Sequence, residues 1–255
     1  MAGCLVSRIR PDAILIDLFD TLVSIDARRL PRRVVDGREY VVTIANLEEL
    51  LAEMGGEVSV KAFYDALWAV SAELAEEKGR THKEIPSRER FLRTLARLGA
   101  PAGCERLAEE LSRRHMETLT GAVVCPEGRS DLLETLGSRY RLALVSNFDD
   151  GPAARRLLGR HRLEGHFDAV LISEEVGQRK PAAGIFLEAC RALGVEPGRA
   201  LHVGDSYRDD VCGAAAAGLD AVWIDSGDGD PAPALARLAD LAELPAWLDA
   251  TIASR

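Results

Sequence analysis

Five short, mainly apolar runs recur along the sequence and constrain its fold more than any other feature. They lie at residues 13–16, 142–145, 169–172, 200–203 and 221–224. Runs of this kind are typical of parallel strands that are buried on both faces. Segments with helical spacing of apolar residues lie between or after them, at residues 129–136, 152–158, 182–193 and 209–217. This alternation predicts an α/β fold built on a doubly wound, Rossmann-like parallel sheet.

The interval 23–124 breaks this alternation. It holds four segments with helical spacing, at residues 47–54, 61–77, 88–98 and 105–119, and no convincing strand. We therefore predict a core formed by residues 1–22 and 125–255, with an inserted α-helical domain at residues 23–124. Its basic segment at residues 28–33 is interpreted as a solvated loop, although its arginines could also bind an anionic substrate. A last helix is expected at residues 232–248.

Composition excludes several classes of protein. The longest apolar runs are too short to span a membrane. A net charge of −9 argues against a nucleic-acid partner, because phosphate backbones attract basic surfaces. The five cysteines are scattered without a CxxC pair, which is typical of reduced thiols rather than disulfides or a zinc site. Since the chain also starts without an apolar leader, these features predict a cytoplasmic protein.

Acidic side chains follow two of the predicted strands. Asp17 comes directly after the first strand, and Asp205 and Asp210 follow the fourth. Ligands of open α/β sheets bind where the carboxyl ends of the strands meet, so the three carboxylates could converge and Asp17 could serve as a nucleophile. Carboxylates in one pocket raise each other's pKa, and a divalent cation would relieve that repulsion. An all-oxygen ligand set favours Mg²⁺.

Four segments at strand ends form the motif set of one family: Asp17-Leu18-Phe19-Asp20-Thr21, Ser146-Asn147, Lys180-Pro181 and Gly204-Asp205-Ser206-Tyr207-Arg208-Asp209-Asp210. In order and context the set resembles the haloacid dehalogenase-like hydrolases, and the helical insertion resembles the cap domain of one subclass. The resemblance implies catalytic roles for Asp17, Thr21, Ser146 and Lys180, and substrate binding by Ser146, Asn147 and Lys180. It also implies Mg²⁺ ligands at Asp17, the backbone carbonyl of Phe19, Asp205 and Asp210.

Phe19 departs from the family pattern. Phosphatases of the family carry a second aspartate at this position, which acts as the general acid and base. A positioned general acid contributes roughly 10² to 10⁴ in rate, so its loss should slow the hydrolysis of alkyl phosphates. Asp20 is the adjacent carboxylate, but neighbouring side chains on an extended segment point in opposite directions. We therefore expect Asp20 to be a structural turn residue.

These features lead to three hypotheses. The first is a Mg²⁺-dependent phosphohydrolase that acts through an aspartyl-phosphate on a small phosphorylated metabolite and prefers acyl or aryl phosphates. The second is a 2-haloacid dehalogenase, because dehalogenases of the family carry an aromatic residue at the position of Phe19 and halide leaves without a proton. Those enzymes lack the metal aspartate that this chain keeps as Asp205, which favours the first. The third is a binding or regulatory protein of low turnover on the same fold.

Overall fold

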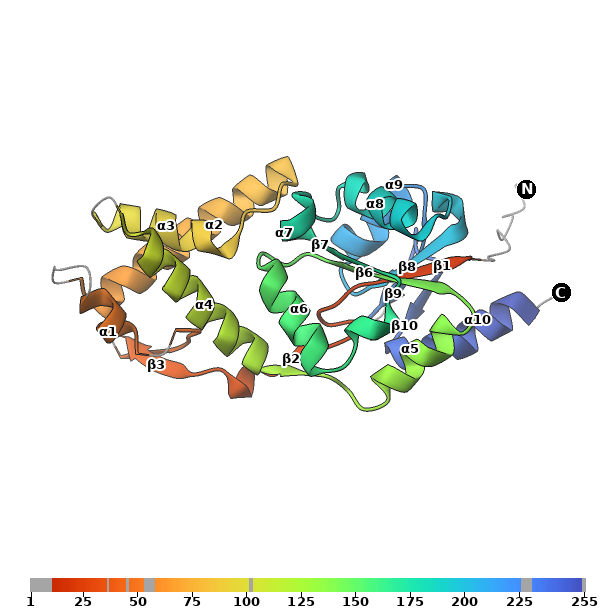
Figure 1. Cartoon of the computed structure of the whole chain (residues 1–255), viewed down its shortest axis with the longest axis horizontal. Helices are drawn as coiled ribbons and strands as arrows, with labels where there is room; N and C mark the ends of the chain where they lie inside the picture. Colours follow the sequence, from red (N-terminus) through yellow and green to blue (C-terminus); the bar gives the residue numbers. More distant parts are fainter. Residues whose placement is uncertain are drawn as a thin grey trace.

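The computed structural model describes residues 11–35, 37–44, 46–52, 58–100, 103–225 and 231–253. Its centre is a six-stranded sheet with the strand order β10-β9-β8-β1-β6-β7 (Figure 1). Every neighbouring pair in the sheet is parallel. The strands are β1 Ala13–Ile16, β6 Arg141–Ser146, β7 Ala169–Ile172, β8 Ala200–Gly204, β9 Asp220–Ile224 and β10 Ala236–Leu238. The predicted parallel α/β core is confirmed.

Helices cover both faces of this sheet. In β1, Ile14 and Ile16 belong to one hydrophobic cluster and Leu15 to the other, because successive side chains of a strand alternate between faces. The first cluster is completed by α5 (Arg129–Gly137), α6 (Gly151–Arg160) and α10 (Leu244–Ala253), and the second by α8 (Ala183–Leu193) and α9 (Gly213–Ala216). Burial on both sides explains why the strand reads as an unbroken apolar run.

A group of helices lies to one side of the sheet, between β1 and β6 in the chain (Figure 1). They are α1 Leu47–Ala52, α2 Val60–Thr81, α3 Ser87–Arg97 and α4 Glu105–Gly121. All four predicted helices are present, apart from residues 53 and 54, which lie outside the described residues. Their own hydrophobic cluster includes Phe63, Phe91 and Leu95. The division into a core and a cap at residues 22 and 125 stays a prediction, and residues 1–10 lie outside the described chain.

The same interval contains strands, so the expectation of a purely helical insertion was wrong. β3 (Arg32–Val35) and β4 (Arg38–Val41) form an antiparallel hairpin, and Gly37 between them has a φ of +76°. The hairpin exposes Val34 and Val41 and carries charges at several other positions. It therefore shows neither an apolar run nor the alternation of buried apolar and exposed polar residues that marks a half-buried strand. Beside it, β2 (Ser24–Ile25) pairs with β5 (Val123–Val124).

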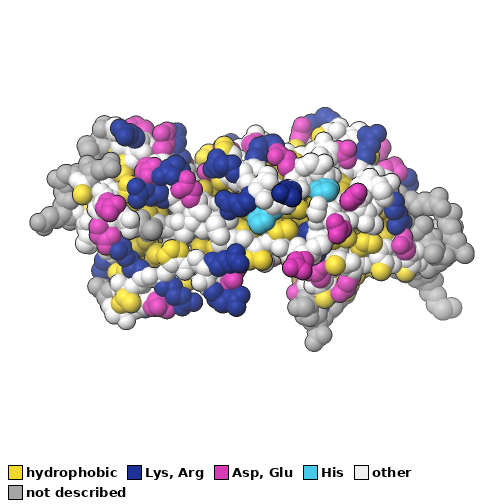
Figure 2. Space-filling model, turned by 60° about the horizontal axis from the view of Figure 1, so that its bottom comes forward, with side chains coloured by type: hydrophobic (Ala, Val, Ile, Leu, Met, Phe, Trp, Pro, Cys, Tyr) yellow, Lys and Arg dark blue, Asp and Glu magenta, His cyan; other side chains and the backbone are white. Residues whose placement is uncertain are grey.

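The basic segment 28–33 lies at the surface. Arg28 pairs with Asp26 at 2.8 Å, and Arg32 pairs with Glu39 at 2.8 Å. None of the arginines in this segment lines the cavity described below. Figure 2 shows basic and acidic side chains interspersed over the face drawn. These pairs support the interpretation of the segment as solvated.

The end of the chain differs from the helix expected at residues 232–248. β10 adds a sixth strand beside β9, and α10 begins only at Leu244. Between them Asp240 accepts a hydrogen bond from the Ala242 N–H, and its carboxylate pairs with Arg129 of α5 at 2.8 Å. This cap starts a new helical turn. A strand of three residues is too short to be recognised as an apolar run, so the sequence pattern missed it.

Among the described residues, no helix combines the length and the apolar composition that a membrane span requires.

Candidate active site

A cavity of about 210 Å³ opens where β1, β6 and β8 end. These strands are neighbours at the centre of the sheet, so the segments that follow them meet at one edge. Seven of the eight residues predicted for the site line the cavity: Asp17, Phe19, Ser146, Asn147, Lys180, Asp205 and Asp210. The eighth, Thr21, is buried without lining it. Four further residues line the cavity that the sequence did not single out for the site: Asp20, Arg179, Ser206 and Asp209.

Three carboxylates converge in this cavity. One oxygen atom from each of Asp17, Asp205 and Asp210 lies within 4.8 Å of the others. Such a group of oxygen donors fits a hard divalent cation, and Mg²⁺ in particular is held by few carboxylates and retains several waters. The residues present therefore fit Mg²⁺, and these three side chains could hold it. A contribution from the Phe19 carbonyl stays a prediction.

Asp210 is positioned by its neighbours in β8 and in the turn after it. Its Oδ1 lies 2.8 Å from Nε2 of His202, and its Oδ2 accepts the Ser206 backbone N–H at 2.9 Å. A Cβ at Gly204 would lie 2.2 Å from Cγ of Asp210, so only glycine leaves room for this carboxylate. Asp210 belongs to a π-helical turn, Tyr207–Cys212, which continues into α9. The helix predicted from residue 209 thus begins two residues earlier, at residue 207.

Lys180 joins two of the three carboxylates. Its Nζ donates hydrogen bonds to Oδ1 of Asp17 at 2.5 Å, to Oδ1 of Asp210 at 2.6 Å and to the Val145 carbonyl at 2.9 Å. All three protons of the ammonium group are therefore used, and the side chain is 2% exposed. Asn147 holds the lysine backbone, because its amide accepts from the Lys180 N–H at 2.8 Å and donates to the Lys180 carbonyl at 3.0 Å. Substrate binding by Asn147 stays a prediction.

The buried charges shift one another's ionisation. Burial raises the pKa of Asp17 to about 7; Lys180 opposes the shift and the negative charge of Asp210 adds to it. Burial and the charges of Asp210 and Asp20 raise the pKa of Asp205 to about 6. Burial acts in the same direction on Asp210, but Lys180 and the hydrogen bond from His202 outweigh it and lower the pKa of Asp210. Two carboxyl groups that resist ionisation so close together support the fit of a cation to this site.

Phe19 contributes an aromatic surface to the cavity. Its ring packs against Phe148 with a distance of 5.1 Å between the ring centroids, and both rings join a hydrophobic cluster with Met116 and Ile172. The position to which the resemblance assigns a general acid thus carries an apolar side chain.

Asp20 differs from the expectation. It adopts the turn conformation that we predicted, with a φ of +57°. This backbone is left-handed rather than extended, however, so the alternation of side chains along an extended segment does not apply and does not turn Asp20 away from the site. Asp20 is exposed and lines the cavity beside Phe19.

Two buried hydroxyl groups near the carboxylates lack hydrogen-bond partners. Oγ of Ser146 and Oγ1 of Thr21 contact no donor or acceptor within hydrogen-bond distance in the part of the chain that the structure describes. Since buried polar groups are normally paired, an unpaired hydroxyl that borders the cavity is available to a ligand, which applies to Ser146 and not to Thr21. The Ser146 hydroxyl lies in the cavity wall itself. His202 and Arg179 carried no recognisable sequence pattern; the polar residue within an otherwise apolar strand was the one available sign of His202.

The chain resembles known proteins both in sequence and in structure. A family model described as haloacid dehalogenase-like hydrolase matches residues 11–218. A phosphoserine phosphatase of Thermus thermophilus is 38% identical over 163 residues, which are 62% of this chain and 64% of the relative. The human haloacid dehalogenase-like hydrolase domain-containing protein 3 is 42% identical over 117 residues, 44% of either chain. The matched segments thus span about half to two thirds of these relatives.

Two solved structures share the fold along almost the whole chain. A 2-haloacid dehalogenase of Pseudomonas syringae superposes with a TM-score of 0.69 at 26% identity, and the match covers 94% of this chain and 99% of the other. A putative hydrolase of Bacillus subtilis that was solved with magnesium gives a TM-score of 0.60 at 21% identity, with the same coverage. At that identity the second likeness concerns the fold alone.

Proposed function

The chain belongs to the haloacid dehalogenase-like hydrolases, and from this we propose that it is a Mg²⁺-dependent phosphohydrolase that forms an aspartyl-phosphate on Asp17. The observation that carries the proposal is the contact of Lys180 with Asp17 and Asp210, beside the third carboxylate Asp205. A phosphoryl group brings several negative oxygens to its site. The buried ammonium group of Lys180 and a bound cation would balance the negative charge of the phosphoryl group. Relatives named as phosphatases support the same activity.

The proposed reaction has two steps. An oxygen of Asp17 forms a bond to phosphorus while the bond to the leaving oxygen breaks, and the bonding electrons depart with that oxygen. Lys180, which already contacts Asp17, stays beside the transferred group, and the unpaired Ser146 hydroxyl donates to a phosphoryl oxygen. Water then attacks phosphorus while the bond between phosphorus and the Asp17 oxygen breaks, which restores the carboxylate and releases phosphate that carries both protons of the water. Asp17, Asp205 and Asp210 would hold Mg²⁺, which would supply neutralising charge.

The apolar contact of Phe19 predicts which substrates react fastest. Without an acid at this position the leaving oxygen departs unprotonated, so we expect kcat/KM for acetyl phosphate and an aryl phosphate to exceed that for a sugar phosphate by roughly 10²- to 10⁴-fold. The comparison uses kcat/KM because this parameter excludes the second step, which is common to all substrates. Turnover should disappear in EDTA and return with Mg²⁺. Equal kcat/KM values would overturn the leaving-group preference, and activity in EDTA would overturn the metal dependence.

A 2-haloacid dehalogenase is the second candidate. The aromatic ring of Phe19 in the cavity and the structural likeness to a 2-haloacid dehalogenase favour it. The retained Asp205 disfavours it, because an uncompensated carboxylate would repel a departing halide. Halide release from 2-chloropropionate in the presence of EDTA tests this candidate, and undetectable release removes it.

If Mg²⁺ and phosphate together raise the melting temperature but no substrate yields product, the protein is instead a binding protein on the same fold.

Asp205→Asn is expected to weaken the metal site without removing the nucleophile. Loss of one charged ligand should raise the Mg²⁺ concentration that gives half-maximal rate by about 10- to 100-fold. Excess Mg²⁺ should then recover much of the rate, and a Mg²⁺ titration with an aryl phosphate measures both effects. Asp131→Asn, which changes an exposed aspartate of α5, is the matched control and should titrate like the unmutated protein. A rate that stays low at any Mg²⁺ concentration would contradict the role of Asp205.

A further inference from the structure

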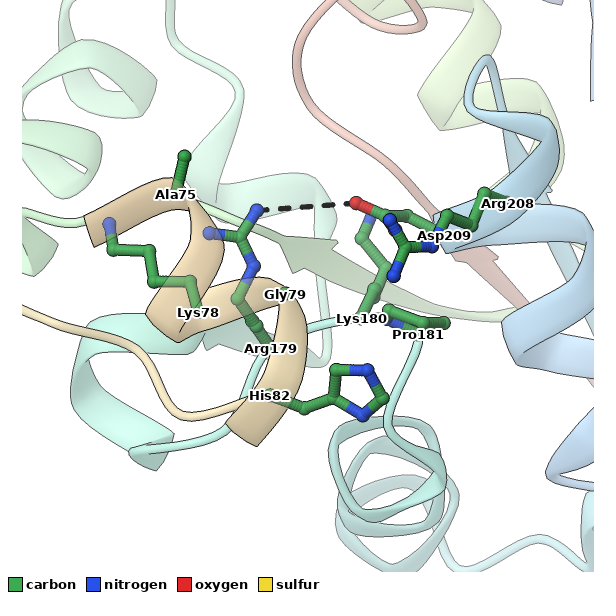
Figure 3. A pocket seen from close by; sticks show the side chains of 9 residues that line it. All are labelled: Ala75, Lys78, Gly79, His82, Arg179, Lys180, Pro181, Arg208 and Asp209. Carbon is green, nitrogen blue, oxygen red and sulfur yellow. Dashed lines mark ion pairs between the residues drawn. The ribbon is translucent and has the colours of Figure 1, made fainter. Parts of the chain in front are cut away.

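A second cavity, of about 160 Å³, adjoins the catalytic cavity (Figure 3). Arg179, Lys180 and Asp209 line both cavities. The second one extends from these residues to the last turns of α2, which contribute Lys78, and to its C-cap residue, His82. A group attached to a phosphate in the catalytic cavity has this space beside it. The volume is below the roughly 300 Å³ of ordinary ligand pockets, so the cavity suits a substituent of a few atoms.

The two cavities carry opposite charge. The catalytic cavity is lined by five aspartates and only two cationic side chains. The second is lined by four cationic side chains, Lys78, Arg179, Lys180 and Arg208, and a single carboxylate, Asp209. This is a local reversal in a chain with a net charge of −9. The local field, rather than the net charge, governs which ligand a cleft attracts.

Two of the four cationic side chains already form close ion pairs with carboxylates of the protein. Lys180 is bonded to Asp17 and Asp210, and Nζ of Lys78 lies 2.6 Å from Glu84. In Figure 3 the Lys78 side chain points away from the cavity. These two residues therefore leave the arginines as the groups that could meet a ligand there.

The two arginines have weaker contacts with the described part of the chain than the two lysines. Arg179 lies 3.7 Å from Glu84 and 4.0 Å from Asp209, at the limit of an ion pair. The side chain of Arg208 has no hydrogen bond or ion pair within the described ranges of the chain, and in Figure 3 it reaches back toward Arg179. Asp209 also accepts a hydrogen bond from Asn147, so it is shared between the two cavities. The surplus charge of the second cavity thus resides on Arg179 and Arg208.

We infer that the second cavity binds an anionic substituent of the substrate, with Arg208 and Arg179 as its partners. This inference rests on the proposed phosphohydrolase function and narrows it: the substrate is a small phosphate compound with a second negative group, such as a carboxylate, on its leaving part. A guanidinium group presents paired N–H donors that match the two oxygens of such a group. The catalytic cavity takes the phosphoryl group with its cation, and the adjoining cavity takes the leaving part.

Two aryl phosphates that differ only in charge test this inference. 3-Carboxyphenyl phosphate and 3-carbamoylphenyl phosphate have nearly the same shape and similar leaving groups. The unmutated protein should favour the carboxylate by about tenfold in kcat/KM, mainly through KM, because a hydrogen bond to a charged group is worth that much. Arg208→Ala should lower the preference severalfold, because only Arg179 then remains, while the carbamoyl compound changes less than twofold. Arg208→Lys should retain part of it. The 4-substituted pair repeats the comparison with the charge in a second position.

Arg106→Ala is the matched control, because Arg106 is an exposed arginine of α4 that lines a separate groove. It should leave the preference unchanged. If both compounds of both pairs are hydrolysed at equal kcat/KM, or if Arg208→Ala keeps the preference, the second cavity does not bind the anion. If none of the compounds is hydrolysed with Mg²⁺, the proposed function itself fails. The two failures are thus distinguishable.

Discussion

Asp17→Asn is expected to lower kcat for an aryl phosphate by about 10⁴-fold or more. The change removes the oxygen that would attack phosphorus, and loss of a covalent nucleophile has effects of that size in other enzymes. An amide oxygen can still coordinate a cation, so Mg²⁺ binding measured by calorimetry should persist in weakened form. Loss of turnover with retained metal binding would distinguish Asp17 from Asp205, whose replacement excess Mg²⁺ should rescue.

Asp20→Asn is the control for this prediction, since Asp20 is the exposed carboxylate in the same turn. Its kcat for the aryl phosphate should stay within about threefold of the unmutated value, because this leaving group needs little protonation, and a larger loss would identify Asp20 as the general acid. Beryllofluoride, which mimics a phosphoryl group on a carboxylate, should form its adduct on Asp17 in a crystal of the unmutated protein. Substantial activity of Asp17→Asn, or an adduct on Asp20 or Asp205, would overturn the assignment of the nucleophile.

The parallel core could be predicted because its strands are buried on both faces. Burial on both sides of β1 makes residues 13–16 continuously apolar, and that pattern survives in the sequence without any alignment. The hairpin β3–β4 and the strand β10 could not be predicted in this way. Val34 and Val41 point to solvent, and β10 depends on β9 for its hydrogen bonds. Where burial does not select the side chains, the sequence carries no period to recognise.

The site could be predicted as far as its residues follow strand ends. Asp17 and Asp205 were found in this way, since the carboxyl ends of neighbouring parallel strands meet. The turn at Asp20 was predicted, but its left-handed backbone and the place of its side chain in the cavity wall could not be deduced from the residue order. Arg208 was missed for a different reason. It belongs to a motif that supplies two of the three converging carboxylates, and only the position of α2 shows that its side chain borders a cavity.

Lys180→Met is expected to destabilise the metal-free protein by about 3–5 kcal/mol at pH 8. The ammonium group lies between Asp17 and Asp210, and its side chain is 2% exposed. Removing Lys180 leaves two buried carboxylates without a compensating positive charge, and such a loss is strongly destabilising. The melting temperature should fall by roughly 10 °C, a shift typical of this loss in a chain of this size. Activity should disappear as well, because Lys180 contacts the proposed nucleophile, Asp17.

The loss of stability in Lys180→Met depends on pH because burial raises the pKa of Asp17. Burial raises the pKa of Asp17 from 3.8 to about 7. Between these two pH values the Asp17 carboxyl group is protonated in the folded protein and ionised in the unfolded chain. Folding is therefore favoured as the pH falls from about 7 toward 4, and protonation removes one of the two repelling charges. The destabilisation by Lys180→Met should shrink between pH 8 and pH 5, and Mg²⁺ at pH 8 should restore part of the lost stability.

Lys61→Met, at an exposed lysine paired with Asp65, is the control and should change stability by less than about 0.5 kcal/mol. A Lys180 variant as stable as this control at pH 8 would show that the buried carboxylates do not depend on Lys180 for their compensation.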